Sequence, residues 1–528
     1  MSQDKKPTVF LREATGLVKR ASFLDAISLN ISNMSVGAAL GVIGYTMTAV
    51  NVIGLNLVIA SILAFVLSIP QVIVYTMMVK RVPRTGGDYV WVTRTLGGLF
   101  GAPLSLMGYP LETMAYMALI VLAGVNAIGS VGLFFGNSSF LGIELPPNLP
   151  GANPTEQILI GAFIFIVLIL VNIFAPRAGF RLVSVLTLFG IGTLLIAIFS
   201  YLIIGRAGII NYMNLLQSLS NANPPVTYQS LSSAYKGPDF DFGATIFMLP
   251  FFAIFVFPWL NAGPAVSAEI KGKNAVEWNV PIAAITVFVL VTAAFGAMYY
   301  AGGLHFINMA LSNPTLVFDW SFNFWTLAMG ITNNTFLQYI MGAGWVAWEF
   351  AILAYAIIVT SRYIFAQAFD GFLPARFAYV SSRYGSPVNS LAFIAIMVLA
   401  LSTISAYFYG GFQTLYAATI ASMIYFFFVG IAAVIYAQRN EKGGAKGMLS
   451  AAGILMAGVF AYIIYDYLAN PTIWGTAVTV ANIPGTYFAY LYVVGSFIVG
   501  LILYDISRIR YSKQGINIEL AFKTIPPE

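Results

Sequence analysis

The sequence predicts an all-α membrane protein that crosses the bilayer about twelve times. Of its 528 residues, 59% are hydrophobic and only 8% are charged, whereas soluble proteins carry roughly 25% charged residues. So little charge cannot solvate a globular surface. The apolar residues gather in runs of about 20, the length that a helix needs to span a bilayer. These two observations predict a polytopic helical fold.

Twelve apolar runs can be placed along the chain. Their approximate bounds are 25–48, 52–78, 97–130, 156–175, 181–204, 242–266, 279–301, 336–368, 388–408, 412–436, 449–469 and 486–506. With both termini inside, all of the 25 basic residues except Arg206 and Lys236 fall inside or at the inner face. Because Lys and Arg are retained in the cytoplasm, we expect a plasma-membrane protein with cytoplasmic termini.

The spans divide the chain into six parts. We expect a cytoplasmic tail (1–21), a first block of five spans (22–204), an extracellular loop (205–241), a second block of five spans (242–436), two further spans (437–507) and a cytoplasmic tail (508–528). The two blocks enter the membrane from opposite faces. Corresponding spans of the two blocks are therefore expected to play corresponding roles.

The sixth span contains a helix-breaking residue near its middle. Pro258 has no amide hydrogen and its ring collides with the preceding turn, and Asn261 and Gly263 follow it. In hydrocarbon, freed backbone groups are tolerated only where protein or a water-filled cavity surrounds them. The alternative is a plain proline kink.

The first span contains a second irregular stretch, at residues 28–39. It crowds five polar side chains next to Gly37: Ser28, Asn30, Ser32, Asn33 and Ser35. Its alternative interpretation is a packing face of small residues. Two interrupted helices at corresponding places in two halves are typical of a transporter site.

Two carboxyl groups fall inside predicted spans. Glu112 lies in the third span and Glu349 in the eighth, beside Trp345 and Trp348. Ionisable residues at this depth are costly and are functional candidates; the alternative is that burial keeps them protonated. Asp466, near the outer end of the eleventh span, is expected to be solvated.

The inner loops carry the most specific motifs. Residues 83–89 read Pro-Arg-x-Gly-Gly-x-Tyr, residues 361–374 read Ser-Arg-x-x-x-Ala-x-x-x-Asp-Gly-x-x-Pro, and Pro-Val-Asn follows at 387–389. Arg362 and Asp370 are close in sequence, which favours an ion pair between them in the gate region. Together with Glu-Ile-Lys at 269–271, these motifs resemble the amino acid–polyamine–organocation (APC) family of permeases.

The resemblance runs from about Ser22 to the end of the tenth span. It implies a LeuT-type inverted repeat of five plus five spans, with two C-terminal helices added. It also implies that backbone amides of residues 32–38 bind a substrate carboxylate and that carbonyls of residues 255–259 bind its ammonium. The expected substrate-binding residues are Ser32, Asn33, Ser35, Val36, Gly37, Ala38, Phe255, Phe257, Pro258, Trp259 and Asn261.

The sequence also offers candidate coupling and gating groups. These are Glu112, Glu349, Trp345, Thr360, Ser361, Arg362 and Asp370. The hydroxyls of Thr360 and Ser361 are candidate sodium ligands, or ordinary helix hydroxyls that bond to the preceding turn. The chain departs from the family at Pro258-Trp259, where a glycine is usual, and the fifth span lacks the lysine of many proton-coupled members.

The leading hypothesis is a secondary transporter of amino acids that works by alternating access. Spans 1, 2, 6 and 7 would move against spans 3, 4, 8 and 9, driven by H⁺, Na⁺ or exchange, with no cofactor. The alternatives are a polyamine or cationic amino acid transporter and, less favoured, a channel or sensor. An enzyme is disfavoured, because the chain has no HExxH, GxSxG or cysteine, and the dispersed basic residues disfavour nucleic acid as a partner.

Overall fold

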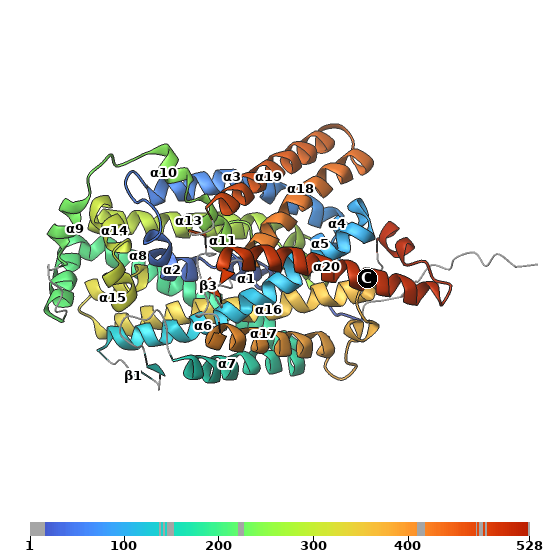
Figure 1. Ribbon diagram of the computed structural model, residues 1–528, viewed down its shortest axis with the longest axis horizontal. Helices are drawn as coiled ribbons and strands as arrows, with labels where there is room; N and C mark the ends of the chain where they lie inside the picture. The colour runs from blue at the N-terminus through green and yellow to red at the C-terminus, as the bar shows by residue number, and fades with distance from the viewer. Residues whose placement is uncertain are drawn as a thin grey trace, which may run out of the picture.

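The computed structural model describes residues 16–136, 139–140, 143–144, 153–219, 226–408, 418–470, 473–474, 479–480 and 483–525. In Figure 1 the long helices run side by side along the long axis of the molecule. Eleven helical segments of the described chain are long and apolar enough to cross a membrane. The predicted fold class, an all-α polytopic membrane protein, is confirmed. Residues 1–15 of the predicted tail and 412–417 of the predicted tenth span lie outside the described residues.

The described residues from 16 to 219 form eight numbered α-helices, one π-helical turn and a hairpin. The elements are α1 (Phe23–Asn33), α2 (Val36–Met47), α3 (Leu57–Arg81), α4 (Asp88–Leu96), α5 (Gly98–Leu106), the π-helical η1 (Met107–Leu111), α6 (Glu112–Phe134), the paired strands β1 (Ser139–Phe140) and β2 (Ile143–Glu144), α7 (Pro154–Phe174) and α8 (Pro176–Leu219). Inside α8, Gly205 has non-helical angles, so the helix bends where the predicted fifth span ends.

The second half contains the broken sixth span and the remaining helices. Its elements are α9 (Tyr228–Ala234), α10 (Phe242–Ile246), α11 (Leu249–Phe255), α12 (Ala262–Ala265), η2 (Ser267–Glu269), α13 (Lys273–Gly302), α14 (Leu304–Leu311), η3 (Thr315–Asp319), α15 (Phe324–Ile331), α16 (Thr335–Phe369), η4 (Ala375–Ala378), α17 (Val388–Phe408), α18 (Thr419–Asn440), α19 (Gly443–Ala469), the paired strands β3 (Thr479–Val480) and β4 (Ile483–Pro484), α20 (Gly485–Ser512) and η6 (Ile518–Lys523).

Local sequence explains where the first helices begin. Ser22 caps α1 in a capping box with Asp25, and Asn56 caps α3 by accepting from two backbone amides; such caps replace the hydrogen bonds that a first turn lacks. Among the described residues, eleven predicted spans are long enough to cross a membrane, the first of them formed by α1 and α2 together. The predicted sixth span is the exception, because α10, α11 and α12 are each too short to count.

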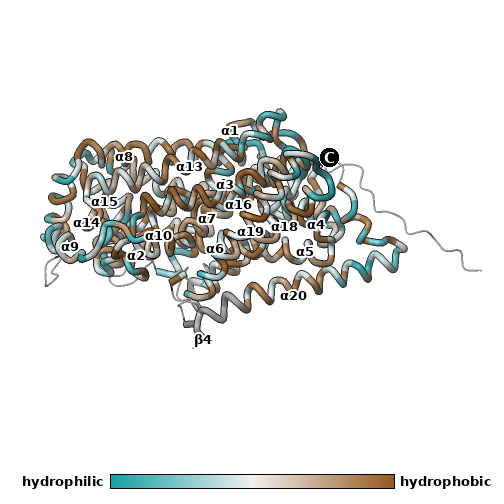
Figure 2. The backbone as a smooth tube through the Cα atoms, turned by 90° about the horizontal axis from the view of Figure 1, so that it is seen from above, coloured by the Kyte–Doolittle hydropathy of each residue, from teal (hydrophilic) through white to brown (hydrophobic). Residues whose placement is uncertain are grey.

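The outer surface of the bundle is apolar. Large hydrophobic side chains such as Leu159, Phe163, Ile285 and Val289 are exposed, as expected for helices that face lipid. In Figure 2 the hydrophilic residues gather toward the two ends of the long axis. We call the end that holds α4, η4 and η6 the terminal end, and the end that holds α9, α14 and α15 the loop end (Figure 1).

The interior places the first span at its centre. Helix α1 packs against α8, α13 and α16, and α16 packs against α6 and α8. At the terminal end, Ala21, two residues before α1, pairs with the segment after η2, since the Lys271 amide donates to the Ala21 carbonyl at 2.9 Å. The start of the first span and the end of the sixth span therefore lie side by side.

The prediction that Asp466 is solvated is wrong. Its side chain is only 3% exposed, because α19 packs against α18 and α3. One carboxylate oxygen accepts from the Asn470 side chain at 2.7 Å. Nearness to a helix end did not imply contact with water here.

Candidate functional site

The first span is broken between α1 and α2. Ser35 has left-handed angles (φ 39°, ψ 41°), which are uncommon for a residue other than glycine. Its hydroxyl donates to the Ser32 carbonyl at 3.0 Å, which stabilises the turn. The break therefore lies at Met34 and Ser35, inside the predicted stretch 32–38. Ser32 and Asn33 end α1, whereas Val36, Gly37 and Ala38 form the first turn of α2.

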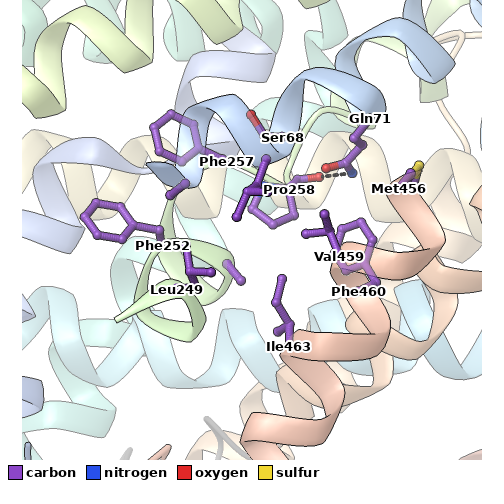
Figure 3. Close-up of a pocket in the computed structure, with 13 residues that line it drawn as sticks. Ser68, Gln71, Leu249, Phe252, Phe257, Pro258, Met456, Val459, Phe460 and Ile463 are labelled. Carbon is purple, nitrogen blue, oxygen red and sulfur yellow. Dashed lines mark hydrogen bonds between the residues drawn. The ribbon is translucent and has the colours of Figure 1, made fainter. Parts of the chain in front are cut away.

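The sixth span is broken over residues 256–261, between α11 and α12. Two side chains hold the freed backbone. The Trp259 indole donates to the Ile254 carbonyl at 2.7 Å, and the Gln71 amide donates to the Pro258 carbonyl at 2.7 Å; Figure 3 draws the second bond as a dashed line. The break begins one residue later than predicted, because Phe255 still belongs to α11.

The two breaks lie in direct contact. The Asn33 side chain donates to Asn261 at 2.9 Å, and the Gly263 amide donates to Asn30 at 2.8 Å. Asn30 also donates to Asn279 on α13 at 2.7 Å. All four asparagines are buried, so hydrogen bonds to one another replace those to water. Sequence analysis identified Asn33 and Asn261 but missed Asn279, which lies in an otherwise ordinary helix.

The aromatic residues of the sixth span point in two directions. Trp259 stacks on Tyr116 of α6 with ring centroids 6.0 Å apart. Phe257 instead packs against Phe65 and lines an apolar cavity of about 400 Å³ beside Pro258. Figure 3 shows this cavity between the sixth-span break and helix α19. Phe255 packs against Phe251. Phe257 therefore faces this cavity and α3, whereas Trp259 faces α6.

Glu349 lines a second cavity, of about 430 Å³, on the loop-end side of the first-span break. The cavity walls come from α2, α6, the η3–α15 region and α16, and include Gly41, Tyr45, Asn126, Ser130, Ser321, Asn323 and Trp345. Trp345 and Trp348 lie close against α2, since a Cβ at Gly41 or Gly37 would come within 2.4 or 2.0 Å of their rings. The Trp325 indole donates to the Gly37 carbonyl at 2.8 Å.

Glu112 follows directly after the π-helical turn η1 and is fully buried. One carboxyl oxygen accepts from Thr113 at 3.1 Å, and the other finds no hydrogen-bond partner among the described residues. None of the ion pairs in the described part of the chain involves Glu112 or Glu349. Two uncompensated carboxyl groups thus lie inside the bundle.

The two candidate sodium ligands have different surroundings. The Thr360 hydroxyl has no hydrogen-bond partner among the described residues. The Ser361 hydroxyl donates to the Ile358 carbonyl at 2.7 Å and accepts from the Arg362 guanidinium at 2.9 Å. A guanidinium at this distance disfavours a second cation at Ser361.

The predicted ion pair between Arg362 and Asp370 is wrong. Both residues belong to one continuous helical stretch, in which eight residues span about 12 Å. Arg362 instead forms a bidentate pair with Glu269 of η2 at 2.7 and 2.9 Å, with both side chains 2% exposed. Asp370 pairs with Arg94 of α4 at 2.5 and 2.9 Å.

One carboxylate of the terminal end with several hydrogen bonds was missed. Asp88 is the first residue of α4, is fully buried and accepts from the hydroxyls of Tyr75, Tyr363 and Tyr425. Tyr89 donates in turn to Asp370 at 2.8 Å. The signal was present, since Asp88 and Tyr89 lie within the motif at 83–89, but the motif was used only for the family resemblance.

Comparison with known protein families agrees with this geometry. Residues 22–502 match the family described as amino acid permease. A search of curated proteins found no match. The family match covers most of the chain and includes both broken spans, the two buried carboxyl groups and the ion pairs of the terminal end. This is a family of membrane transporters, not of enzymes, and the chain belongs to the amino acid permease family of the APC superfamily.

Proposed function

We propose that this permease moves amino acids by alternating access and holds its substrate between the broken first and sixth spans. The observation that carries the proposal is the direct contact of the two breaks, through Asn33–Asn261 and Asn30–Gly263. The first turn of α2 has amides without helical partners, and such a terminus favours a carboxylate. The carbonyls of residues 256–261 favour an ammonium group. A zwitterion meets both requirements.

Two sets of helices move against each other in this proposal. The first set contains α1–α2, α3, α10–α12 and α13, and the second contains α5–α6, α7, α16 and α17. At the terminal end they are joined by Arg362–Glu269 and by the bond from Asn261 to Tyr363 at 3.0 Å. These bonds have to break before the terminal end can open. Their presence supports a state that is closed at this end.

A second candidate is a transporter of cationic amino acids or polyamines. The observation that favours it is the pair of buried carboxyl groups, Glu112 and Glu349, which lack an ion-pair partner among the described residues. An additional positive charge on the substrate would compensate one of them. The alternative role for these groups is to carry coupling protons.

Uptake into proteoliposomes tests the proposal. The full chain is reconstituted and offered labelled alanine, leucine, lysine, glutamate and putrescine in separate reactions. We expect saturable uptake of one or more amino acids, accelerated by unlabelled substrate inside. Preference for lysine or putrescine over alanine and leucine would favour the second candidate.

A substitution locates the site within the same assay. Asn261→Ala removes the neutral hydrogen bond between the breaks and is expected to raise KM several-fold, because such a bond contributes about 1 kcal/mol. The matched control is Asn172→Ala, because Asn172 is buried but bonds only within α7. An unchanged KM in the Asn261 variant would place the substrate elsewhere, and unsaturable flux would indicate a channel.

A further inference from the structure

Asp88 is a buried carboxyl group that the proposed substrate site does not use. The Tyr75 hydroxyl donates to one of its oxygens at 2.5 Å. The hydroxyls of Tyr425, at 2.8 Å, and of Tyr363 donate to the other. The Tyr89 amide donates to the same carboxylate. These four donors occupy the roughly four acceptor positions that a carboxylate offers.

The three tyrosines come from different parts of the proposed machinery. Tyr75 lies on α3, in one moving set, and Tyr363 lies on α16, in the other. Tyr425 belongs to α18. Because Tyr363 also accepts from Asn261 at 3.0 Å, Asp88 is linked to the junction of the breaks through one intervening side chain, that of Tyr363. Relative movement of α3 and α16 has to pull this cluster apart.

The surroundings of Asp88 contain tyrosines but no bonded cation. Facing it are Tyr75, Tyr89, Tyr363 and Tyr425, with Tyr109 of η1 stacked on Tyr363 at 4.1 Å. Two ion pairs lie at the same end of the bundle, Arg94–Asp370 and Arg362–Glu269. Among the described residues neither pair bonds to Asp88, so no cation compensates its charge. Burial accordingly raises the pKa of Asp88 to about 6, against the hydrogen bonds that lower it.

We propose that Asp88 is a proton-binding site and that binding of the proton favours closure of the terminal end. We call the part of the bundle that opens there the terminal gate. Closure buries the carboxyl group, and opening exposes it to water, which takes its proton. Protonated Asp88 donates to one of the tyrosine oxygens, each of which can accept as well as donate, so both protonation states fit the closed cluster. The proposal rests on the proposed function in one respect, that the terminal end opens.

The direction of the effect follows from linkage. Protons favour the state with the higher pKa. The closed state has the raised value, whereas a hydrated aspartate returns toward about 3.9. Acid therefore stabilises the closed gate. With these two values, the open fraction is expected to fall about tenfold between pH 8 and pH 5.

The absence of cysteine from the chain allows this to be measured by labelling. Ser267 is buried in η2, and its hydroxyl donates to the Arg84 carbonyl at 3.3 Å, so a cysteine there reports opening of the terminal end. The full-length Ser267→Cys chain in detergent is labelled with a maleimide from pH 5 to pH 8. Rates are normalised to those of Lys513→Cys, at an exposed position, because the thiol itself titrates. We expect the normalised rate to fall with acidification around pH 6.

Variants of the cluster identify the group responsible. Asp88→Asn resembles the protonated form and is expected to give slow labelling at every pH. Tyr425→Phe removes one donor to the ionised form and is expected to raise the midpoint of the profile, which keeps the test informative if Asp88→Asn does not fold. The control is Asp505→Asn, an exposed carboxyl group on α20, which is expected to keep the parent profile.

Three outcomes would overturn the proposal: a pH-independent parent chain, an unchanged profile in Asp88→Asn, or an unchanged midpoint in Tyr425→Phe. None of them requires substrate. Failure of uptake with an intact labelling profile would instead count against the proposed function alone. The two inferences are therefore tested separately.

Discussion

At the scale of single residues, the terminal end is held by charges removed from water. Glu269 and Arg362 are each 2% exposed and make two parallel hydrogen bonds. Such a pair repays its desolvation only with good geometry, and removal of one member leaves an unpaired buried charge. The pair between Lys80 and Glu277 stays in contact with water, since the Lys80 side chain is 52% exposed. Such a pair contributes little to stability.

Glu269→Gln is therefore expected to be strongly destabilising. It leaves the Arg362 guanidinium buried with a neutral partner, at a cost of about 3–5 kcal/mol. Lys80→Gln is the matched control and is expected to cost less than about 1 kcal/mol. Thermal unfolding of the purified variants in detergent measures both. Similar losses in the two variants would show that burial does not strengthen the Glu269 pair.

At the scale of helices, two glycines of the first span leave room for tryptophan rings of α16 to pack against α2. A Cβ on Gly37 would lie 2.0 Å from the Trp348 ring, and one on Gly41 would lie 2.4 Å from the Trp345 nitrogen. Because Trp348 is also enclosed by Gly190 of α8, it has little room to retreat. This contact fixes α2 against α16 immediately after the first-span break.

Gly37→Ala is expected to force these helices apart. Overpacking of this kind costs about 1–3 kcal/mol and should also reduce uptake, because the first turn of α2 moves. In Gly296→Ala on α13 the added methyl group meets nothing within 4 Å, so helix propensity predicts a neutral or slightly stabilising change. Unfolding midpoints and uptake rates are measured for both. A Gly37 variant as stable and active as the Gly296 variant would contradict the packing described.

The breaks illustrate what local sequence can predict. Pro258 predicted the sixth-span break because its ring and missing amide act on its own helix. In the first span the prediction centred near Gly37, yet the left-handed residue is Ser35. The reason is the pair of bonds from the Ser35 hydroxyl to the carbonyls of Ser32 and Asn33, and composition does not reveal which serine makes them.

At the scale of the whole molecule, the hydrophobic runs predicted the spans but not which side chains of different spans contact one another. The hydrophobic runs gave the fold class because each helix must satisfy its own backbone. The cluster at Asp88, by contrast, assembles side chains from positions 75, 363 and 425. The partner of Arg362 likewise comes from η2 rather than from its own helix. Such contacts depend on how helices pack, and no local pattern specifies them.

The distribution of basic residues predicts which end of the molecule faces the cytoplasm. The basic residues follow the helix ends: Lys80 and Arg81 end α3, Arg84 and Arg94 lie before and within α4, and Arg439 and Lys442 lie where α18 ends and α19 begins. Arg206 instead lies beside Gly303, before α14, and Lys236 follows α9. Since basic loops stay inside, a membrane-impermeant maleimide on intact cells is expected to label Lys236→Cys and to spare Lys442→Cys.

Detergent supplies the control, because both exposed positions should then react. Labelling of Lys442→Cys alone on intact cells would invert the orientation. The terminal gate would then open outward, and Asp88 would exchange its proton with the outside. With the expected orientation, each opening of this gate exposes Asp88 to the cytoplasm, so cytoplasmic pH sets how readily the gate opens.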